Sequence, residues 1–169
     1  NLKTALADYT SPVLFVSRSD STLRGHYPVE TDVMNEWLGP FDATLLTPAF
    51  FEGGRITRDS THYLMVDGKP VPTHETEFAR DSVFGYRHSY LPDYVEEKTA
   101  GRIPAAAVKR FLLADLRAGV YKQLLALGGN ACAVVDAETQ DDLNRFAADL
   151  LKAAGRAAAR RRGAFRSSR

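Results

Sequence analysis

The chain has 169 residues, of which 44% are hydrophobic and 25% are charged. This length and composition predict one soluble domain with a real core, and they exclude wholesale disorder and collagen-like structure. The net charge of +1 is unevenly spread, because residues 156–169 carry six arginines and no acid, which leaves 16 basic and 21 acidic residues, a net −5, in residues 1–155. An acidic body argues against a nucleic-acid-binding protein, and no apolar run approaches the roughly 20 residues that span a bilayer.

The first third of the chain predicts alternating strands and helices. The apolar run 12–17 predicts a strand buried on both faces, and apolar residues at helical spacing from Pro28 predict a helix that ends at the Gly-Pro pair 39–40. Residues 43–47 predict a second strand, which completes a βαβ unit and implies a parallel sheet. Residues 48–59 are expected to form a loop.

The middle of the chain changes character. Residues 62–66 and 69–73 flank an Asp-Gly pair, which predicts a β-hairpin with a tight turn. Residues 74–104 contain scattered proline and glycine, and they predict irregular structure around one short helix near 92–98.

The last third returns to the α/β pattern. Residues 109–114 predict a strand, Asp115 is expected to cap a helix over 116–127, and 131–136 form the clearest strand of the chain. Thr139 is expected to open a helix with one apolar face, made of Leu143, Phe146, Ala147, Leu150 and Leu151. These elements together predict an α/β fold: a three-layer α/β/α arrangement with a mainly parallel sheet and an inserted β-hairpin.

The single cysteine, Cys132, lies in an apolar run and is interpreted as a buried structural thiol. One cysteine cannot form an internal disulfide, which is consistent with a cytoplasmic protein. The four histidines do not have metal-ligand spacing, so no metal site is expected. Tyrosines at 86, 90 and 94 recur every four residues, which indicates packing rather than nucleobase stacking.

The loop 20–25 holds a high density of groups that can bind a ligand. Ser21 and Thr22 can donate and accept hydrogen bonds, Arg24 offers a planar fork for a carboxylate or phosphate, and Gly25 lets a ligand approach the backbone. Because ligands of parallel α/β sheets bind beyond the carboxyl ends of strands, this loop is a candidate site for a small hydroxylated anion. The alternative is structural: Asp20 and Ser21 cap the following helix, and Arg24 forms a surface ion pair.

Two further strand ends carry polar residues. Gly53-Gly54-Arg55 follows the second strand and places Arg55 as a second candidate clamp for an anion, although the pattern alone favours a flexible turn with a solvated arginine. Asp136 ends the third strand. The sequence contains no glycine-rich phosphate loop, no dinucleotide fingerprint and no nucleophile elbow, so no cofactor-binding motif is found in this chain.

An ordered set of motifs resembles the four-carbon acid sugar kinase family, over nearly the whole chain. The most specific is Asp20-Ser21-Thr22-Leu23-Arg24-Gly25, and the others follow it in the family's order. These are 47–50 (Thr-Pro-Ala-Phe), 53–55 (Gly-Gly-Arg), Tyr63, 66–68 (Val-Asp-Gly), 75–79 (Glu-Thr-Glu-Phe-Ala), Asp81, 134–139 (Val-Val-Asp-Ala-Glu-Thr) and 141–143 (Asp-Asp-Leu). Residues 165–168 resemble the strand that closes the family's N-terminal domain.

The resemblance implies a two-domain, ATP-dependent kinase for sugar acids such as threonate or erythronate. Its N-terminal α/β domain binds the sugar acid, and its C-terminal domain binds most of the ATP, with Mg²⁺. Carried over by motif, the substrate-binding residues of this chain are Asp20, Ser21, Thr22, Arg24, Gly25 and Arg55. No residue is assigned as the general base, since phosphoryl transfer depends mainly on positioning and charge stabilisation.

The chain departs from the family at both ends. The acidic A-D-D-x-T-G-A motif of the family's first strand and the ATP-binding domain are not found here. Residues 1–169 are therefore expected to be one incomplete N-terminal domain that has no kinase activity alone. A non-catalytic anion-binding module and, less favoured, a nucleic-acid-binding protein that acts through the arginine-rich tail are the alternatives. The substrate's stereochemistry and the oligomeric state, including self-association, are left open.

Overall fold

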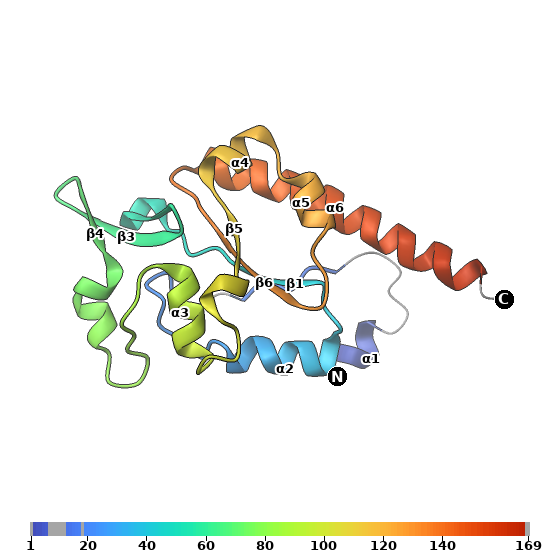
Figure 1. Ribbon diagram of the computed structural model, residues 1–169, viewed down its shortest axis with the longest axis horizontal. Coiled ribbons are helices and arrows are strands. Elements are labelled where there is room, and N and C mark those ends of the chain that lie inside the picture. The colour runs from blue at the N-terminus through green and yellow to red at the C-terminus, as the bar shows by residue number, and fades with distance from the viewer. Residues whose placement is uncertain (1, 7–12, 18, 168–169) are drawn as a thin grey trace.

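A computed structural model describes residues 2–6, 13–17 and 19–167, without the side chains of residues 2, 3 and 159–167 (Figure 1). Its strands are β1 (Ala43–Leu46), β2 (Arg55–Arg58), β3 (Thr61–Val66), β4 (Lys69–Pro72), β5 (Lys109–Phe111) and β6 (Ala131–Val135). Its α-helices are α1 (Leu2–Leu6), α2 (Val29–Leu38), α3 (Leu91–Lys98), α4 (Leu113–Ala118), α5 (Tyr121–Leu125) and α6 (Gln140–Ser167). No helix in this described part is both long enough and apolar enough to cross a bilayer.

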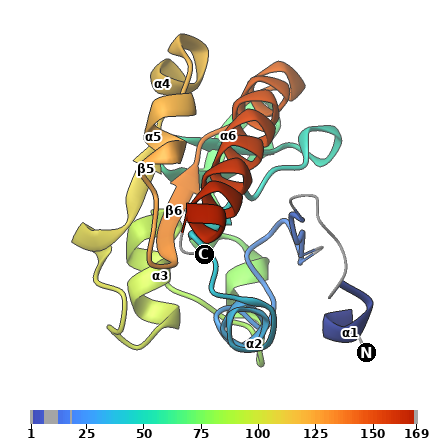
Figure 2. The same ribbon diagram turned by 90° about the vertical axis from the view of Figure 1, so that its right-hand side faces the viewer.

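The main sheet is parallel, with the strand order β1-β6-β5. The central strand β6 is apolar throughout, because both of its faces are buried. Cys132 and Val134 point into a core shared with α3, whereas Ala133 and Val135 point into a core shared with α4, α5 and α6. Helices α2 and α3 lie on one side of this sheet and α4, α5 and α6 on the other, so the fold has the expected three layers (Figures 1 and 2).

The second sheet is antiparallel, with the order β2-β3-β4. Its β3–β4 hairpin turns at Asp67-Gly68, which confirms the predicted hairpin. Strand β2 was not expected, since its residues Arg55–Arg58 fall within the predicted loop 48–59. It forms because β3 offers a free edge, and the pair Thr57 and Ala137 exchange backbone hydrogen bonds that join this sheet to the carboxyl end of β6.

The predicted first strand is wrong for residues 13–17, which form no strand; residue 12 lies outside the described residues. Val13, Leu14 and Val16 are 39%, 44% and 79% exposed. A strand needs a ladder partner, and in the described part of the chain β1 pairs only with β6. The βαβ unit expected over 12–47 is therefore absent from the described residues, although α2 and β1 are confirmed and the sheet is parallel.

The helix predicted over 116–127 is two helices. Gly119, with φ of +98°, separates α4 from α5, because a left-handed residue ends one helix and turns the chain into the next. Asp115 lies in the third helical position rather than at the cap, where its carboxylate accepts the Leu112 N–H at 3.2 Å.

Helix α6 begins as predicted. Its Asp142 carboxylate accepts the Thr139 N–H at 3.1 Å, and the Asp142 N–H donates to the Thr139 hydroxyl at 3.3 Å. The expected apolar face is only partly buried: Phe146 is 5% exposed, but Leu151 is 63% exposed. The strand expected at 165–168 is wrong for 165–167, which continue α6, because the alanine- and arginine-rich stretch before them favours a helix; residue 168 lies outside the described residues.

Candidate functional site

The Asp20 carboxylate organises the loop 20–25. Its Oδ1 accepts the Thr22 backbone N–H at 3.1 Å, and its Oδ2 accepts the Thr22 hydroxyl at 2.5 Å and Arg24 Nε at 2.6 Å. Partial burial alone would raise the pKa of Asp20, but these hydrogen bonds outweigh it and lower the pKa below its ordinary value. Asp20 is thus ionised at neutral pH and engaged with its own loop.

Arg24 reaches from the same loop towards a second segment. Its Nη1 lies 3.7 Å from Asp81 Oδ2, and its guanidinium carbon lies 5.0 Å from the centre of the Phe78 ring. Backbone N–H groups that bond to Asp81 lower the pKa of that carboxyl, so Asp81 is also ionised. The ion-pair alternative for Arg24 is therefore present in the structure, and the arginine still keeps 34% of its side chain exposed.

The helix-capping alternative does not hold. Pro28 occupies the N-cap position of α2, and no side chain in the described part of the chain caps this helix. The Asp20 carboxylate accepts its hydrogen bonds from Thr22 and Arg24, within the loop. The conformation of Asp20 and Ser21 therefore serves the loop itself, and neither side chain caps the helix.

Arg55, at the start of β2, meets Arg24 at the same ring. Its guanidinium carbon lies 5.6 Å from the centre of Phe78 and 5.4 Å from the centre of Phe50. Its Nε is buried without a hydrogen-bond partner, and in the described part of the chain Arg55 forms no ion pair. The two arginines singled out from the sequence therefore converge on one aromatic side chain, and Arg55 is the one without an acidic partner.

Gly53 makes room for this arrangement. A Cβ added there would overlap the Arg55 guanidinium and would lie 2.5 Å from Phe50 Cδ1. The Gly-Gly-Arg motif is therefore more than a flexible turn, since its first glycine lets the guanidinium lie against the loop.

The other predicted loop residues have different surroundings. Thr22 is 1% exposed, and its hydroxyl is used by Asp20 and Arg24, so it shapes the loop from within. Ser21 is half-buried, and its hydroxyl has no hydrogen-bond partner among the described residues. Gly25 has φ of +150° and faces Ser19. Ser21, Arg24 and Arg55 are thus the predicted residues with donors left for a ligand.

Two arginines on an aromatic ring, with a hydroxyl nearby in the loop, can bind a small anion. A guanidinium donates two parallel hydrogen bonds to a carboxylate, and its stacking on an aromatic ring restricts its motion beforehand. The Asp20 and Asp81 carboxylates balance Arg24, and Arg55 supplies the uncompensated positive charge.

Asp136, the third candidate strand end, has a structural position. It is 1% exposed, and its two carboxylate oxygens accept the N–H groups of Asp59 (2.9 Å) and Ser60 (2.8 Å) in the β2–β3 turn. Burial raises the pKa of Asp136 to about 6, in spite of these hydrogen bonds. Its carboxyl therefore holds the antiparallel sheet against the parallel sheet.

Sequence reasoning assigned no role to Phe78, Asp81 or His62. The first two belong to motifs that carried the family resemblance, so that resemblance was the available signal. His62 lies on β3, is fully buried, and donates from Nε2 to the Ser21 carbonyl at 2.7 Å; its Nδ1 lies 2.9 Å from the Thr57 hydroxyl. Burial lowers the pKa of His62 to about 4, so its ring is neutral.

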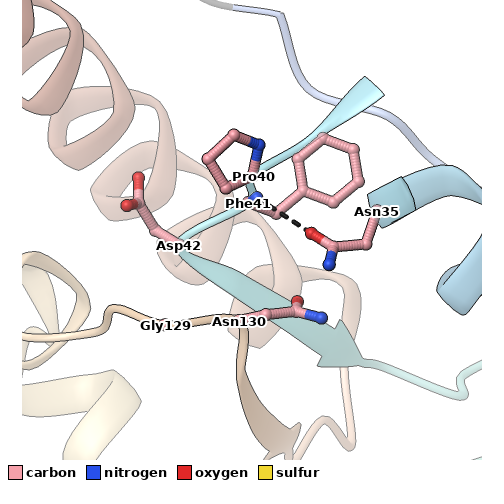
Figure 3. Close-up of a pocket in the computed structure, with 6 residues that line it drawn as sticks. All are labelled: Asn35, Pro40, Phe41, Asp42, Gly129 and Asn130. Atoms are coloured by element: carbon pink, nitrogen blue, oxygen red, sulfur yellow. Dashed lines mark hydrogen bonds between the residues drawn. The ribbon is translucent and has the colours of Figure 1, made fainter. Parts of the chain in front are cut away.

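A shallow hollow of about 440 Å³ lies at the opposite, amino end of β1 and β6 (Figure 3). Its amide groups are used in holding the chain: Asn35 Oδ1 accepts the Phe41 N–H at 3.0 Å, and Asn130 Oδ1 accepts the Thr44 hydroxyl at 2.8 Å. It has no cationic side chain in its lining, so it lacks the groups that an anion site needs.

No group of three or more His, Cys, Asp or Glu side chains within the described part of the chain could hold a metal ion. Cys132 is 5% exposed, and burial raises the pKa of its thiol, which matches the predicted inert, structural role.

Comparison with known families identifies the chain. The family described as "sugar-binding N-terminal domain" matches residues 2–168. The chain belongs to this family. The resemblance to the four-carbon acid sugar kinases, inferred from the ordered motifs, is thereby confirmed.

A curated relative supports the same assignment. The chain is 36% identical over 140 residues to a D-erythronate kinase of Heliobacterium modesticaldum, and the match covers 80% of this chain but 30% of the relative. The chain thus spans about a third of the length of that relative.

Three solved structures share the fold. One is described as a putative tRNA synthase of Salmonella typhimurium LT2 (TM-score 0.62, 22% identity, covering 82% of this chain and 35% of the other). Another is a Haemophilus influenzae protein of the DUF1537 family (TM-score 0.59, 19% identity, 83% and 37%). The third is a DUF1537 domain from Bordetella bronchiseptica with bound citrate, solved as a domain-swapped dimer (TM-score 0.53, 28% identity, 76% and 29%).

Proposed function

We propose that this chain is the sugar-acid-binding part of an ATP-dependent kinase for a four-carbon sugar acid of the erythronate or threonate type. The observation that carries the proposal is the convergence of Arg24 and Arg55 on Phe78, with no acidic partner for Arg55 among the described residues. The name of the Heliobacterium relative supports the substrate class, and the citrate bound to the Bordetella domain supports a hydroxylated carboxylate as ligand.

Each side chain has a proposed part in binding. Arg55 binds the carboxylate, because its buried Nε has no hydrogen-bond partner and its guanidinium has no acidic partner among the described residues, so an ionised ligand would supply both. Arg24, held in place by Asp20, binds a second oxygen from the exposed edge of its fork. Ser21 and Gly25 complete the loop with a hydroxyl donor and an accessible backbone. Asp20 serves Arg24 in this scheme, since a carboxyl with a lowered pKa is a weak general base.

ATP and Mg²⁺ belong to the proposal for the whole kinase. The described residues offer no cluster of metal ligands, and the sequence has no glycine-rich phosphate loop, so they do not fit a nucleotide–metal site. We therefore derive no step of phosphoryl transfer from this chain, and we expect it to be inactive as a kinase by itself. We expect the whole kinase in the cytoplasm, because it would use ATP and because its buried cysteine in this chain forms no internal disulfide. Self-association, as in the Bordetella dimer, is a further expectation.

The experiment is a calorimetric titration of the chain with D- and L-erythronate, D- and L-threonate and a simple carboxylate. We expect one chiral four-carbon acid to bind, Arg55→Ala to weaken its binding at least tenfold, and Arg24→Ala to weaken it by more than about 1 kcal/mol. Arg145→Ala is the matched control, because Arg145 forms only an exposed ion pair with Asp141 on α6. Unchanged binding in a folded Arg55→Ala protein would remove that arginine from the site.

The kinase activity has its own test. The longer polypeptide that contains this chain together with an ATP-binding domain should transfer phosphate from ATP to the acid that binds here. Phosphorylation by the isolated 169-residue chain would contradict the proposed division of roles.

A further inference from the structure

Three consecutive carbonyls of the loop 20–25 are held by three buried side chains. The Ser21 carbonyl accepts His62 Nε2 at 2.7 Å, the Thr22 carbonyl accepts the Tyr86 hydroxyl at 2.7 Å, and the Leu23 carbonyl accepts the Tyr94 hydroxyl at 2.9 Å. The donors come from three separate places, namely β3, the segment before α3, and α3 itself. Their exposed fractions are 0%, 5% and 3%.

The loop needs such support because its own conformation is unfavourable. Leu23 has φ of +66°, a left-handed conformation that L-residues with a side chain rarely adopt. The three interior hydrogen bonds stabilise this conformation. They offset its strain, because a buried carbonyl without a hydrogen bond would cost free energy. Thr22 and Leu23 also bury their side chains, which fixes the loop from below.

The three carbonyls of the loop accept hydrogen bonds from donors in the buried interior. With its carbonyls turned inward, the loop leaves the side chains of Asp20 and Arg24 about one-third exposed. The conformation of the backbone therefore decides where the Arg24 guanidinium lies relative to Phe78 and Arg55. A loop that lost one of its interior hydrogen bonds would present Arg24 in several positions instead of one.

We infer that His62, Tyr86 and Tyr94 are positioning residues that hold the sugar-acid loop in its binding conformation through its three carbonyls. They act through the loop, and none of them needs to touch the ligand. The inference rests on the proposed sugar-acid site. It adds buried residues that affect the affinity for the ligand by fixing the conformation of the loop. It predicts that removing a single phenolic oxygen weakens binding even though no ligand contact is lost.

The test uses the 169-residue chain and the variants Tyr86→Phe and Tyr94→Phe, alone and together. Tyr27→Phe is the matched control, because Tyr27 stacks on Tyr94 in the same core but its hydroxyl contacts Cys132 Sγ at 3.7 Å instead of the loop. All proteins are compared at a temperature where each is folded. Two quantities are measured: hydrogen exchange of the Leu23 and Arg24 amides without ligand, and the Kd for D-erythronate.

We expect each loop variant to speed exchange of these amides and to raise the Kd about tenfold, the effect of one lost buried hydrogen bond. Tyr27→Phe should change neither quantity, even where it lowers Tm. Unchanged exchange and Kd in both single variants would overturn the inference, and equal effects of Tyr27→Phe would show a general loss of stability instead. If the unaltered chain binds no four-carbon acid, the proposed function fails, and the exchange rates still decide the role of the tyrosines.

Discussion

Separate replacement of His62 and Asp136 is expected to reveal two opposite pH dependences of stability that cancel in the native chain. Both side chains are fully buried, and burial moves their pKa values in opposite directions: that of His62 falls to about 4, and that of Asp136 rises to about 6. The ordinary values are 6.5 and 3.8. Each pH unit between the folded and unfolded pKa is worth about 1.4 kcal/mol of stability, so each group contributes about 3 kcal/mol.

The signs follow from which state binds the proton more tightly. The His62 pKa is lower in the folded chain, so its contribution is full above pH 6.5 and is lost as pH falls through 4. The Asp136 pKa is higher in the folded chain, so its contribution is full below pH 3.8 and is lost as pH rises through 6. Between about pH 4 and 6 the two changes oppose each other.

The assay is urea denaturation followed by circular dichroism at about pH 4 and about pH 6.5. His62→Gln keeps a side-chain N–H for the Ser21 carbonyl and should gain about 3 kcal/mol of unfolding free energy on acidification, relative to the native chain. Asp136→Asn should lose about 3 kcal/mol over the same interval. Parallel pH profiles for the native chain and both variants would refute the reasoning, because acids that titrate elsewhere are common to all three proteins.

Two further predictions concern the packing around the site and the last helix. Gly53→Ala should displace both the Arg55 guanidinium and the Phe50 ring, and it should weaken D-erythronate binding severalfold. Tm should stay nearly constant, since the guanidinium ends a flexible side chain and Phe50 is 46% exposed, so both groups can move. Calorimetry and a melting curve decide this, and native affinity would show that the close approach is dispensable. Phe146→Ala should lower the free energy of unfolding by about 3–5 kcal/mol, and Leu151→Ala by less than about 1 kcal/mol, because only Phe146 is buried. Equal urea midpoints for the two variants would contradict the burial of Phe146 and the exposure of Leu151 on α6.

Local patterns predicted the elements that local chemistry determines. The hairpin turn at Asp67-Gly68, the apolar strand β6 and the start of α6 at Thr139 depend on neighbours in sequence, and the structure has all three. The strand expected over 12–17 would depend on a partner strand distant in sequence, and its apolar composition gives no information about such a partner. Gly119 was visible as a glycine, but only the packing of α4 and α5 against α6 shows that it separates two helices.

The structure brings together Arg24 and Arg55, which the sequence singled out, but the sequence did not predict how their charges are paired. The sequence emphasised Arg24 and treated Arg55 as the weaker candidate. The geometry favours Arg55, because Asp20 and Asp81 flank Arg24, whereas the Arg55 guanidinium lies against the Phe50 and Phe78 rings and forms no ion pair among the described residues. Ion pairing of this kind depends on contacts between segments far apart in the chain, so a short sequence motif does not predict it. The three donors beneath the loop are hidden from sequence reasoning for the same reason.

The most direct test of the central claim is a crystal structure of this chain with D-erythronate. The account predicts that the carboxylate of the ligand accepts hydrogen bonds from the Arg55 guanidinium, beside Phe78, with Arg24 donating to a second oxygen of the same ligand. An acid bound instead in the hollow between Asn35 and Asn130, or bound with Arg55 still unpartnered, would contradict it.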